Sequence, residues 1–295
     1  MSNALHVAVV GSINRDDVAG TGIRNRHGWG GILFNVAALL RHGESQLTIT
    51  PIAHLGTDAK QPVEGWLARH RQINTDGLVP LNRRGNLCRL RYHGPDHRDE
   101  RLLYRVPPLT WTRLRPALTA DITLINYISG RDVAIRDLER FRREYRGTIY
   151  IDVHSLLLGR RGDGTRYERR PAHWKRMIDC ADVIQVNERE FEILSRRTAG
   201  TDAVRDWANT VLWPGRCRCL IVTRADRGSL GVFRKGRGWQ MREFESGRRQ
   251  PIPDPTGAGD TFSGAWIAKW LADRDPYTAT HFATRAASRP ARPPI

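Results

Sequence analysis

Short apolar runs alternate along this chain with longer segments whose apolar positions recur at helical spacing. The short runs are rich in β-branched residues and are bounded by polar or turn-forming residues, which favours buried strands. We predict strands at residues 6–10, 47–53, 121–126, 148–153, 182–186 and 219–223, and helices at 33–41, 63–71, 133–145, 174–180, 188–195, 203–212, 263–271 and 277–287. This order of elements is typical of an α/β fold around a mostly parallel sheet.

Two segments break the alternation. Residues 16–27 form a polar stretch after the first strand, and residues 86–106 have alternating apolar positions on either side of the turn Gly94-Pro95-Asp96. The second pattern predicts two antiparallel strands. We expect both segments to form a small β-lid inserted into a single domain that spans residues 1–295. The exposed edges of such a lid offer a surface on which a second subunit could form a homodimer.

Composition is that of a folded soluble protein. Of the 295 residues, 40% are hydrophobic and 27% are charged, as in ordinary globular domains. No apolar run approaches the roughly 18–20 residues that span a bilayer, and the N-terminus shows no basic region or cleavage site of a secretory signal. We therefore expect a cytoplasmic protein without a membrane partner. The spacing of Cys88, Cys180, Cys217 and Cys219 predicts neither a zinc site nor a disulfide framework.

The net charge is strongly positive, at +17. Clustered Lys and Arg would indicate a nucleic-acid-binding surface. In this chain the 48 basic residues are nearly all arginine, and the arginines are interleaved with carboxylates. We expect no specific nucleic-acid partner, although the charge attracts polyanions and anionic substrates in general.

The segment 254–262, with the sequence DPTGAGDTF, carries the clearest chemical signal. Its small residues let backbone N–H groups converge, and the apolar helix that follows would aim its positive dipole end at the same point. Such a helix start holds an anion such as phosphate. Asp260, in the first turn, could then take a proton from an attacking hydroxyl. The alternative is that Asp260 is only a favourable first-turn acid and that the glycines only shape the turn.

This segment resembles the D-x-T-G-A-G-D signature of the ribokinase-like (PfkB-type) family of carbohydrate and nucleoside kinases. Further motifs follow in the order of that family: residues 9–14 (VVGSIN) with Asp16, Gly30-Gly31 with Asn35, residues 55–58 (LGTD) and residues 187–190 (NERE). The resemblance covers nearly the whole chain. It implies a three-layer α/β/α core with a mostly parallel central sheet and a small β-lid. It also implies an ATP-dependent kinase that transfers the γ-phosphoryl group to a hydroxyl of a sugar or sugar derivative.

The resemblance assigns roles at the phosphate end of the site. Asp260 resembles the general base that deprotonates the acceptor hydroxyl. Gly257, Ala258 and Gly259 resemble the anion hole that stabilises charge on the transferring phosphoryl group.

Cation sites are implied in the same way. Asn187 and Glu190 resemble the pair that holds Mg²⁺, largely through water. The Asn-x-x-Glu spacing is also a helix-capping pattern, and both interpretations can hold together. Asp254 resembles a residue near a monovalent-cation site, which would take K⁺, with a purely structural carboxylate as the alternative.

The two substrates are assigned by resemblance as well. The positions that resemble sugar-binding residues are Asn14, Asp16, Gly31 and Asn35. Asn and Asp suit this work because they donate and accept hydrogen bonds without bulk; for Asn35 the alternative is a buried helix residue. The positions that resemble nucleotide-binding residues are Asn187, Thr223 and Gly228.

Departures from the family pattern bear on the ligands. Ile32, Leu33 and Phe34 follow the paired glycines, which favours an acceptor other than plain ribose and leaves a nucleoside kinase as an alternative. Ala225 replaces the first glycine of a T-x-G-x-x-G nucleotide loop, and an Ala at positive φ costs about 1 kcal/mol. A catalytically weak ligand-binding or regulatory homologue is the second alternative, against which the retention of Asp260 argues.

Overall fold

The computed structural model describes residues 5–20, 25–93, 98–212, 215–236, 238–247, 255–289 and 295. Within them, nine strands form one sheet in the order β15-β14-β13-β12-β9-β8-β1-β4-β5. Their bounds are β1 (His6–Val10), β4 (Thr48–Leu55), β5 (Leu78–Pro80), β8 (Ile122–Asn126), β9 (Thr148–Asp152), β12 (Val183–Asn187), β13 (Cys219–Thr223), β14 (Ser229–Lys235) and β15 (Gly238–Phe244). The pairings from β5 to β13 are parallel, and β14 and β15 extend the sheet in antiparallel fashion. The six predicted strands are confirmed, and together with β5, which was not predicted, they make up the parallel part of this sheet.

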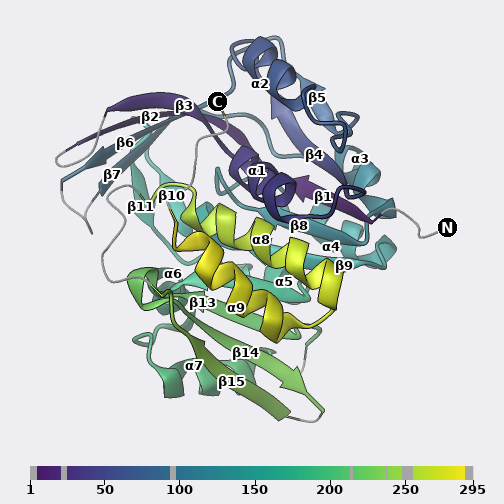
Figure 1. Ribbon diagram of the computed structural model, residues 1–295. Helices are drawn as coiled ribbons and strands as arrows, with labels where there is room; N and C mark the ends of the chain where they lie inside the picture. The colour runs from purple at the N-terminus through teal and green to yellow at the C-terminus, as the bar shows by residue number, and fades with distance from the viewer. Residues whose placement is uncertain are drawn as a thin grey trace.

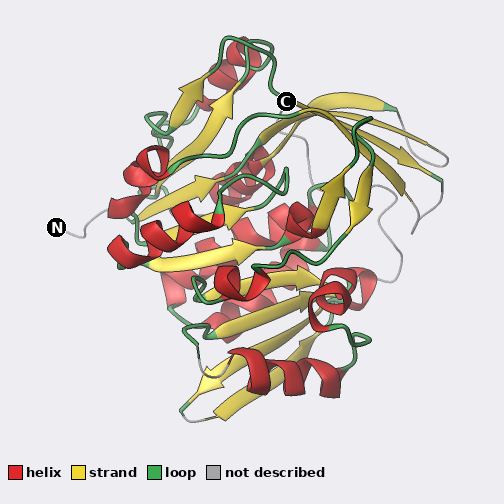
Figure 2. Cartoon of the chain, turned by 180° about the vertical axis from the view of Figure 1, so that it is seen from behind, coloured by secondary structure: helices red, strands yellow, loops and turns green. Residues whose placement is uncertain are grey.

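Residue alternation along the strands produces two hydrophobic cores, one on each face of the sheet. In β1, Val7 and Val9 belong to one core, and Ala8 and Val10 belong to the other. The first core includes side chains of α1 (Ile32–His42), α2 (Lys60–Leu67), α8 (Ala258–Asp273) and α9 (Pro276–Ala287). The second includes side chains of α3 (Trp111–Leu114), α4 (Ile135–Glu144), α5 (Trp174–Ile178), α6 (Glu188–Ser195) and α7 (Thr201–Trp207). Helices α1, α8 and α9 lie in front of the sheet in Figure 1, and the view from behind in Figure 2 shows helices on the other face. The three-layer α/β/α core is therefore confirmed.

A second, four-stranded sheet projects from one end of the core, in the order β3-β2-β6-β7 (Figure 1). It comprises β2 (Ile13–Gly20), β3 (Arg26–Gly31), β6 (Asn86–Tyr92) and β7 (Arg98–Tyr104). The antiparallel pair β6–β7 confirms the hairpin predicted for 86–106, although its turn at 94–96 lies outside the described residues. The polar stretch 16–27 supplies parts of β2 and β3. This sheet is the lid.

Several elements differ from the pattern-based prediction. The helix expected at 63–71 is α2, which begins at Lys60 and ends at Leu67, and the helix expected at 203–212 is α7 followed by a π-helical turn at Ala208–Leu212. Strand β15 escaped prediction because it lies at the sheet edge, where one-sided burial breaks up the apolar run. Strand β14 is buried from Ser229 to Phe233, but Ser229 and Gly231 interrupt its apolar pattern. Among the described helices, none has the length and apolar composition needed to cross a membrane.

Helices α1 and α8 approach each other closely in the first core. At Gly264 of α8, a Cβ atom would lie 2.7 Å from the Cβ of Ala38 and 2.7 Å from the backbone O of Asn35. Glycine is therefore needed for α8 to pack against the backbone of α1. This contact fixes where the first turn of α8 lies relative to α1 and β1.

The turn after β13 contains a strained residue. Ala225 has a φ of 50°, and Gly228 in the same turn has a φ of 93°. An L-residue with a Cβ is disfavoured in this region, whereas glycine populates it readily. The backbone of the turn thus has, at residue 225, the positive φ that favours glycine.

We expect Ala225→Gly to raise the free energy of unfolding by about 1 kcal/mol, because glycine relieves the strain at positive φ. Thermal and urea unfolding would measure the change. Gly228→Ala is the control of opposite sign, since a Cβ there would lie 2.0 Å from the backbone O of Phe244. A lower stability of Ala225→Gly would show that the turn is not strained at this residue.

We expect Gly264→Ala to lower the free energy of unfolding by about 1–3 kcal/mol, because the added methyl group overpacks the α1–α8 contact. The matched control is Gly65→Ala in α2, where a Cβ would meet no atom within 4 Å. That exposed helical glycine should gain roughly 0.5–1 kcal/mol from the same substitution. Equal effects of the two variants in urea unfolding would contradict the close packing at Gly264.

Candidate active site

A cavity of about 390 Å³ lies at the carboxyl ends of the central strands, against the lid. Open α/β sheets bind ligands at this edge. The lid contributes Asn14, Asp16, Cys88, Leu90, Tyr92 and Glu100, and the start of α1 contributes Gly31 and Phe34. The sheet contributes Ile128 after β8, Asp152 at the end of β9, and His154 and Ser155 after it, together with Gln185, Asn187, Glu190, Thr223 and Ala225 around the ends of β12 and β13. Residues 255–260, around the start of α8, complete the wall. Most of the residues singled out from the sequence therefore meet in one cavity.

The start of α8 forms one end of this cavity. Gly257 caps the helix with a φ of 79°, and a Cβ there would lie 2.7 Å from the ring of Phe34. Because α8 has 16 residues, its dipole and first-turn N–H groups give a positive potential at Gly257, Ala258 and Gly259. Asp260 follows in the first turn and is 8% exposed. The arrangement places a carboxylate beside a site that can hold an anion.

Asn35 lies behind the cavity wall. It is fully buried, and its Nδ2 donates to the backbone O of Asp260 at 3.0 Å and to the Oγ of Ser263 at 2.8 Å. The side chain thus ties α1 to the first turn of α8. Asn35 thus lies where the alternative interpretation placed it, as a buried residue of helix α1.

Asp152 is a buried carboxyl in the middle of the wall, at the end of β9. Burial raises its pKa well above the usual range, and the negative charges of Glu190 and Asp260 act in the same direction. Its Oδ2 accepts a hydrogen bond from Nε2 of Gln185 at 3.0 Å, and that nitrogen also donates to the backbone O of Gly259 at 3.1 Å. Gln185 therefore links the end of β12 to the glycine loop that begins α8.

Asn187 and Glu190 form a complete capping box at the start of α6. The Asn187 Oδ1 accepts from the Glu190 backbone N at 2.8 Å, and the Glu190 carboxylate accepts from the backbone N and the Nδ2 of Asn187, both at 2.8 Å. Both residues also line the cavity. The capping interpretation is thus realised in the structure, and the position in the wall keeps the metal interpretation open. Asp254, the residue assigned to a monovalent cation, lies outside the described residues.

The residues that the sequence analysis assigned to sugar binding lie between β2 of the lid and the start of α1. Asn14 and Asp16 are both buried, and the Oδ1 of Asn14 accepts from Nδ2 of Asn86 at 3.0 Å. Glycine is required at Gly30, because a Cβ there would lie 2.1 Å from the Oδ2 of Asp16. Gly31 has a φ of 65° and caps α1. The paired glycines therefore let the lid carboxylate approach the helix start.

The outer edge of the lid is held by a second hairpin, β10 (Leu158–Arg160) and β11 (Arg166–Glu168), which we call the strap. The backbone N of Leu102 in β7 donates to the backbone O of Gly164 at 2.9 Å, and the Nε of Arg160 donates to the backbone O of Leu102 at 2.7 Å. At the opposite edge of the lid, the backbone N of Trp29 donates to the backbone O of Ile295 at 3.1 Å. Both outer strands thus have partners within the chain at these points. A homodimer through the lid stays a prediction.

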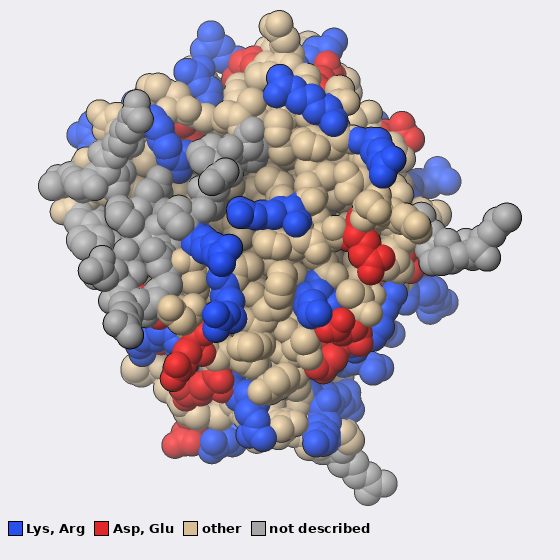
Figure 3. All heavy atoms as spheres, in the orientation of Figure 1, with Lys and Arg blue, Asp and Glu red and all other residues tan. Residues whose placement is uncertain are grey.

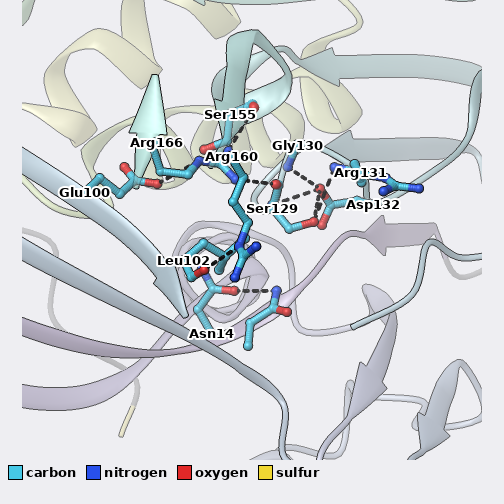
Figure 4. A network of polar contacts seen from close by, with 11 residues as sticks. Asn14, Glu100, Leu102, Ser129, Gly130, Arg131, Asp132, Ser155, Arg160 and Arg166 are labelled. Carbon is cyan, nitrogen blue, oxygen red and sulfur yellow. Dashed lines mark hydrogen bonds and ion pairs between the residues drawn. The ribbon is translucent and has the colours of Figure 1, made fainter. Parts of the chain in front are cut away.

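Arg166 anchors the strap to the floor of the site (Figure 4). Its side chain is 4% exposed, donates to the backbone O of Ser129 at 2.9 Å and to that of Ser155 at 3.1 Å, and lies 3.6 Å from the Glu100 carboxylate of the lid. Asp132, also buried, accepts from the backbone N of Ser129 at 2.9 Å. The charge of Arg166 is thus compensated by one carboxylate and two carbonyl groups, which joins the lid to the loops after β8 and β9.

Thr223 and Ala225 line the cavity at the end of β13. The third predicted nucleotide-binding residue, Gly228, lies at the far end of the same turn, where its positive φ allows β14 to begin. Two arginines of this turn are paired with carboxylates: Arg224 with Glu243 at 3.0 Å and Arg227 with Glu188 at 2.5 Å. The turn is thereby fixed to β15 and α6.

Among the wall residues that the sequence analysis did not place in the site are Tyr92, Glu100, Ile128 and Gln185. The alternation in β6 and β7 places Tyr92 and Glu100 on the same face of the lid as Leu90. The sequence of the lid does not indicate which of its two faces meets the core, so these two residues were not expected in the cavity wall. The hydroxyls of Tyr92 and Thr256 lie 3.2 Å apart, so the lid touches the loop before α8.

The charged surface agrees with the expectation from the sequence. On the face shown in Figure 3, Lys and Arg are spread out with Asp and Glu between them, and they do not gather into one patch. Many arginines are paired, such as Arg176 with Glu139 at 2.6 Å and Arg189 with Glu168 at 2.5 Å.

Comparison with known proteins gives partial sequence matches. Residues 168–289 match the model of the pfkB family carbohydrate kinases. Fructokinase-1 of Oryza sativa subsp. japonica is 36% identical over 95 residues, which cover 32% of this chain and 27% of that protein. Fructokinase-2 of Solanum lycopersicum is 32% identical over 100 residues, covering 34% of this chain and 28% of that protein. The matched stretch thus spans little more than a quarter of the length of these relatives.

Solved structures match over nearly the whole chain. A pyrophosphate-dependent kinase of the ribokinase family, in a sulfate complex, has a TM-score of 0.77 at 18% identity, with 97% of each chain covered. Arabidopsis thaliana ribokinase, complexed with ribose and ATP, has a TM-score of 0.71 at 17% identity, covering 97% of this chain and 91% of that one. The chain therefore has the ribokinase fold, and its residues 168–289 match the model of the pfkB family carbohydrate kinases.

Proposed function

We propose that this protein is an ATP-dependent kinase that transfers the γ-phosphoryl group to a hydroxyl of a sugar or sugar derivative. One observation carries the proposal. Asp260 and the glycine loop at the start of α8 face the same cavity as Asn14 and Asp16, which suit a polyhydroxylated acceptor. The fructokinase matches and the ribokinase fold support the same class of reaction.

In the proposed reaction, the acceptor hydroxyl lies between Asp260 and the transferring phosphorus. The carboxylate accepts the hydroxyl proton as the oxygen attacks the γ-phosphorus, and the bond from that phosphorus to the bridging oxygen of ADP breaks. The backbone N–H groups of Gly257, Ala258 and Gly259, with the dipole of α8, stabilise the charge on the phosphoryl oxygens. Side chains of the lid and the apolar wall around Phe34 keep water away from the phosphoryl group.

The residues at the start of α6 fit a magnesium ion held through water. Asn187 and Glu190 offer the oxygen ligands that Mg²⁺ prefers. Mg²⁺ keeps several waters in protein sites, so two side chains can hold it through its hydration shell. When bound there, Mg²⁺ would neutralise charge on the phosphates of the donor. A K⁺ site at Asp254 stays a further part of the proposal.

The donor and the acceptor are identified by one screen. Sugars, sugar phosphates, polyols and nucleosides are incubated with Mg²⁺ and either ATP or pyrophosphate, because two similar structures are described as pyrophosphate-dependent kinases. ATP with a sugar-like acceptor is the expected pair. Preference for a nucleoside would favour the alternative suggested by the apolar wall at Phe34. No turnover with any pair would favour a ligand-binding homologue.

We expect Asp260→Asn to lower kcat by roughly 10²-fold or more, the usual scale for removing a general base. ATP binding, measured by calorimetry, should stay within a few-fold because the anion hole is unchanged. The control is Asp273→Asn at the far end of the same helix, where the carboxylate pairs with Lys269 at the surface. Wild-type turnover in Asp260→Asn would remove Asp260 from the mechanism.

We expect Glu190→Gln to raise the Mg²⁺ concentration that gives half-maximal rate, because the substitution removes the negative charge that would hold the hydrated ion. Glutamine is also used in capping boxes, so the melting temperature should change little. The rate is measured against Mg²⁺ concentration, and stability by thermal unfolding. A loss of stability with an unchanged Mg²⁺ requirement would leave Glu190 with the capping role alone.

A further inference from the structure

Asn126 occupies the end of β8, directly behind Asp260. Its side chain is fully buried, and its Nδ2 donates to the Oδ1 of Asp260 at 2.7 Å and to the Oδ1 of Asn35 at 3.0 Å. Both hydrogens of one amide group are thereby used on two neighbours. No sequence motif had singled out Asn126.

Among the described residues, the amide group of Asn126 makes no hydrogen bonds besides these two. Its Oδ1 is buried and accepts no hydrogen bond from the residues that the structure describes. A buried acceptor without a partner costs free energy that an apolar side chain of the same shape would avoid. The donor side of the amide must therefore provide an advantage, and its partner in the cavity is Asp260.

We propose that Asn126 is a positioning residue that fixes the rotation of the Asp260 carboxylate and stabilises its ionised form for proton transfer. The inference rests on the proposed function, in which Asp260 is the general base. Asn35 completes the arrangement, because its Nδ2 donates to the backbone O of Asp260 while its Oδ1 accepts from Asn126. Strand β8, helix α1 and helix α8 thus meet at one carboxylate.

The groups around Asp260 explain why an amide donor is needed. From β9, the carboxyl of Asp152 interacts unfavourably with the charge of Asp260. Three amides also lie around Asp260: Asn126 from β8, Asn35 from α1 and Gln185 from β12, which contacts the preceding carbonyl group. A hydrogen bond to the charged form of a carboxylate favours that form. Asn126 therefore opposes the effect of Asp152.

The first test compares Asn126→Leu with the wild type. Loss of the donor should lower kcat by about 10-fold to 100-fold, as expected for a misplaced reacting group, with the acceptor KM changed by less than about 3-fold. The acid limb of the pH profile of kcat/KM should move to higher pH, because the protonated form of Asp260 is no longer disfavoured. Thr123→Val is the matched control, since Thr123 is equally buried on the same strand; its limb should not move. An unchanged limb and kcat in Asn126→Leu would overturn the proposal.

A second variant covers the case in which Asn126→Leu does not fold. Asn126→Asp has the same shape and places a carboxyl group against Asp260, so that the two groups share a proton and the acid limb moves up by about one pH unit or more. A limb that stays in place would show that position 126 does not act on Asp260.

A measurement independent of turnover separates this inference from the proposed function. The carbon-13 signal of the Asp260 carboxyl, assigned with Asp260→Asn, is titrated in the wild type and in the Asn126 variants. A titration at higher pH in the variants supports the positioning role even if no acceptor is phosphorylated, in which case the proposed function fails alone. Identical titrations in wild type and variants would overturn the role of Asn126 even if the enzyme is an active kinase.

Discussion

The close packing of α1 against α8 is the constraint on which the site depends. Both helices begin at glycines with positive φ, Gly31 and Gly257, and Gly264 allows the backbones to approach about two turns further along. Because of this contact, the Phe34 ring of α1 packs on the loop that begins α8. A shift of one helix would separate the part of the cavity wall built on the start of α1 from the part built on the start of α8.

A second constraint is the burial of carboxylates at the end of the sheet. Asp152 and Asp260 lie in a wall with little access to water, and burial raises the pKa of Asp152 well above its usual range. Among their partners are the amides of Gln185, which donates to Asp152, and of Asn126, which donates to Asp260. An amide orients a carboxylate without neutralising it, whereas a paired cation would reduce its ability to take a proton. The choice of amides is thus consistent with a site where one carboxylate must remain reactive.

The sequence predicted the parts of this structure that depend on local pattern. Buried parallel strands are continuous apolar runs, and the glycine loop before α8 is visible because few other residues fit there. Partners brought together by the fold could not be predicted, such as Asn126 with Asp260, which are 134 positions apart. The strap was missed for the same reason: residues 158–168 contain mostly polar and charged side chains, and their pairing with β7 is set by tertiary contacts. Asn35 is the opposite case: its motif singled it out in the sequence, but its side chain is buried behind the cavity wall.

The strap also determines how the lid can move. If the lid opened away from β10 and β11, the backbone bond between Leu102 and Gly164 and the bonds from Arg160 would break, and Arg166 would lose the carboxylate of Glu100. Leaving that buried guanidinium without its partner would cost on the order of 3–5 kcal/mol. If instead lid and strap moved together, Arg166 would be pulled from the carbonyl groups of Ser129 and Ser155. Either motion breaks contacts of a buried charge, so the arrangement in which the strap holds the lid against the cavity is favoured.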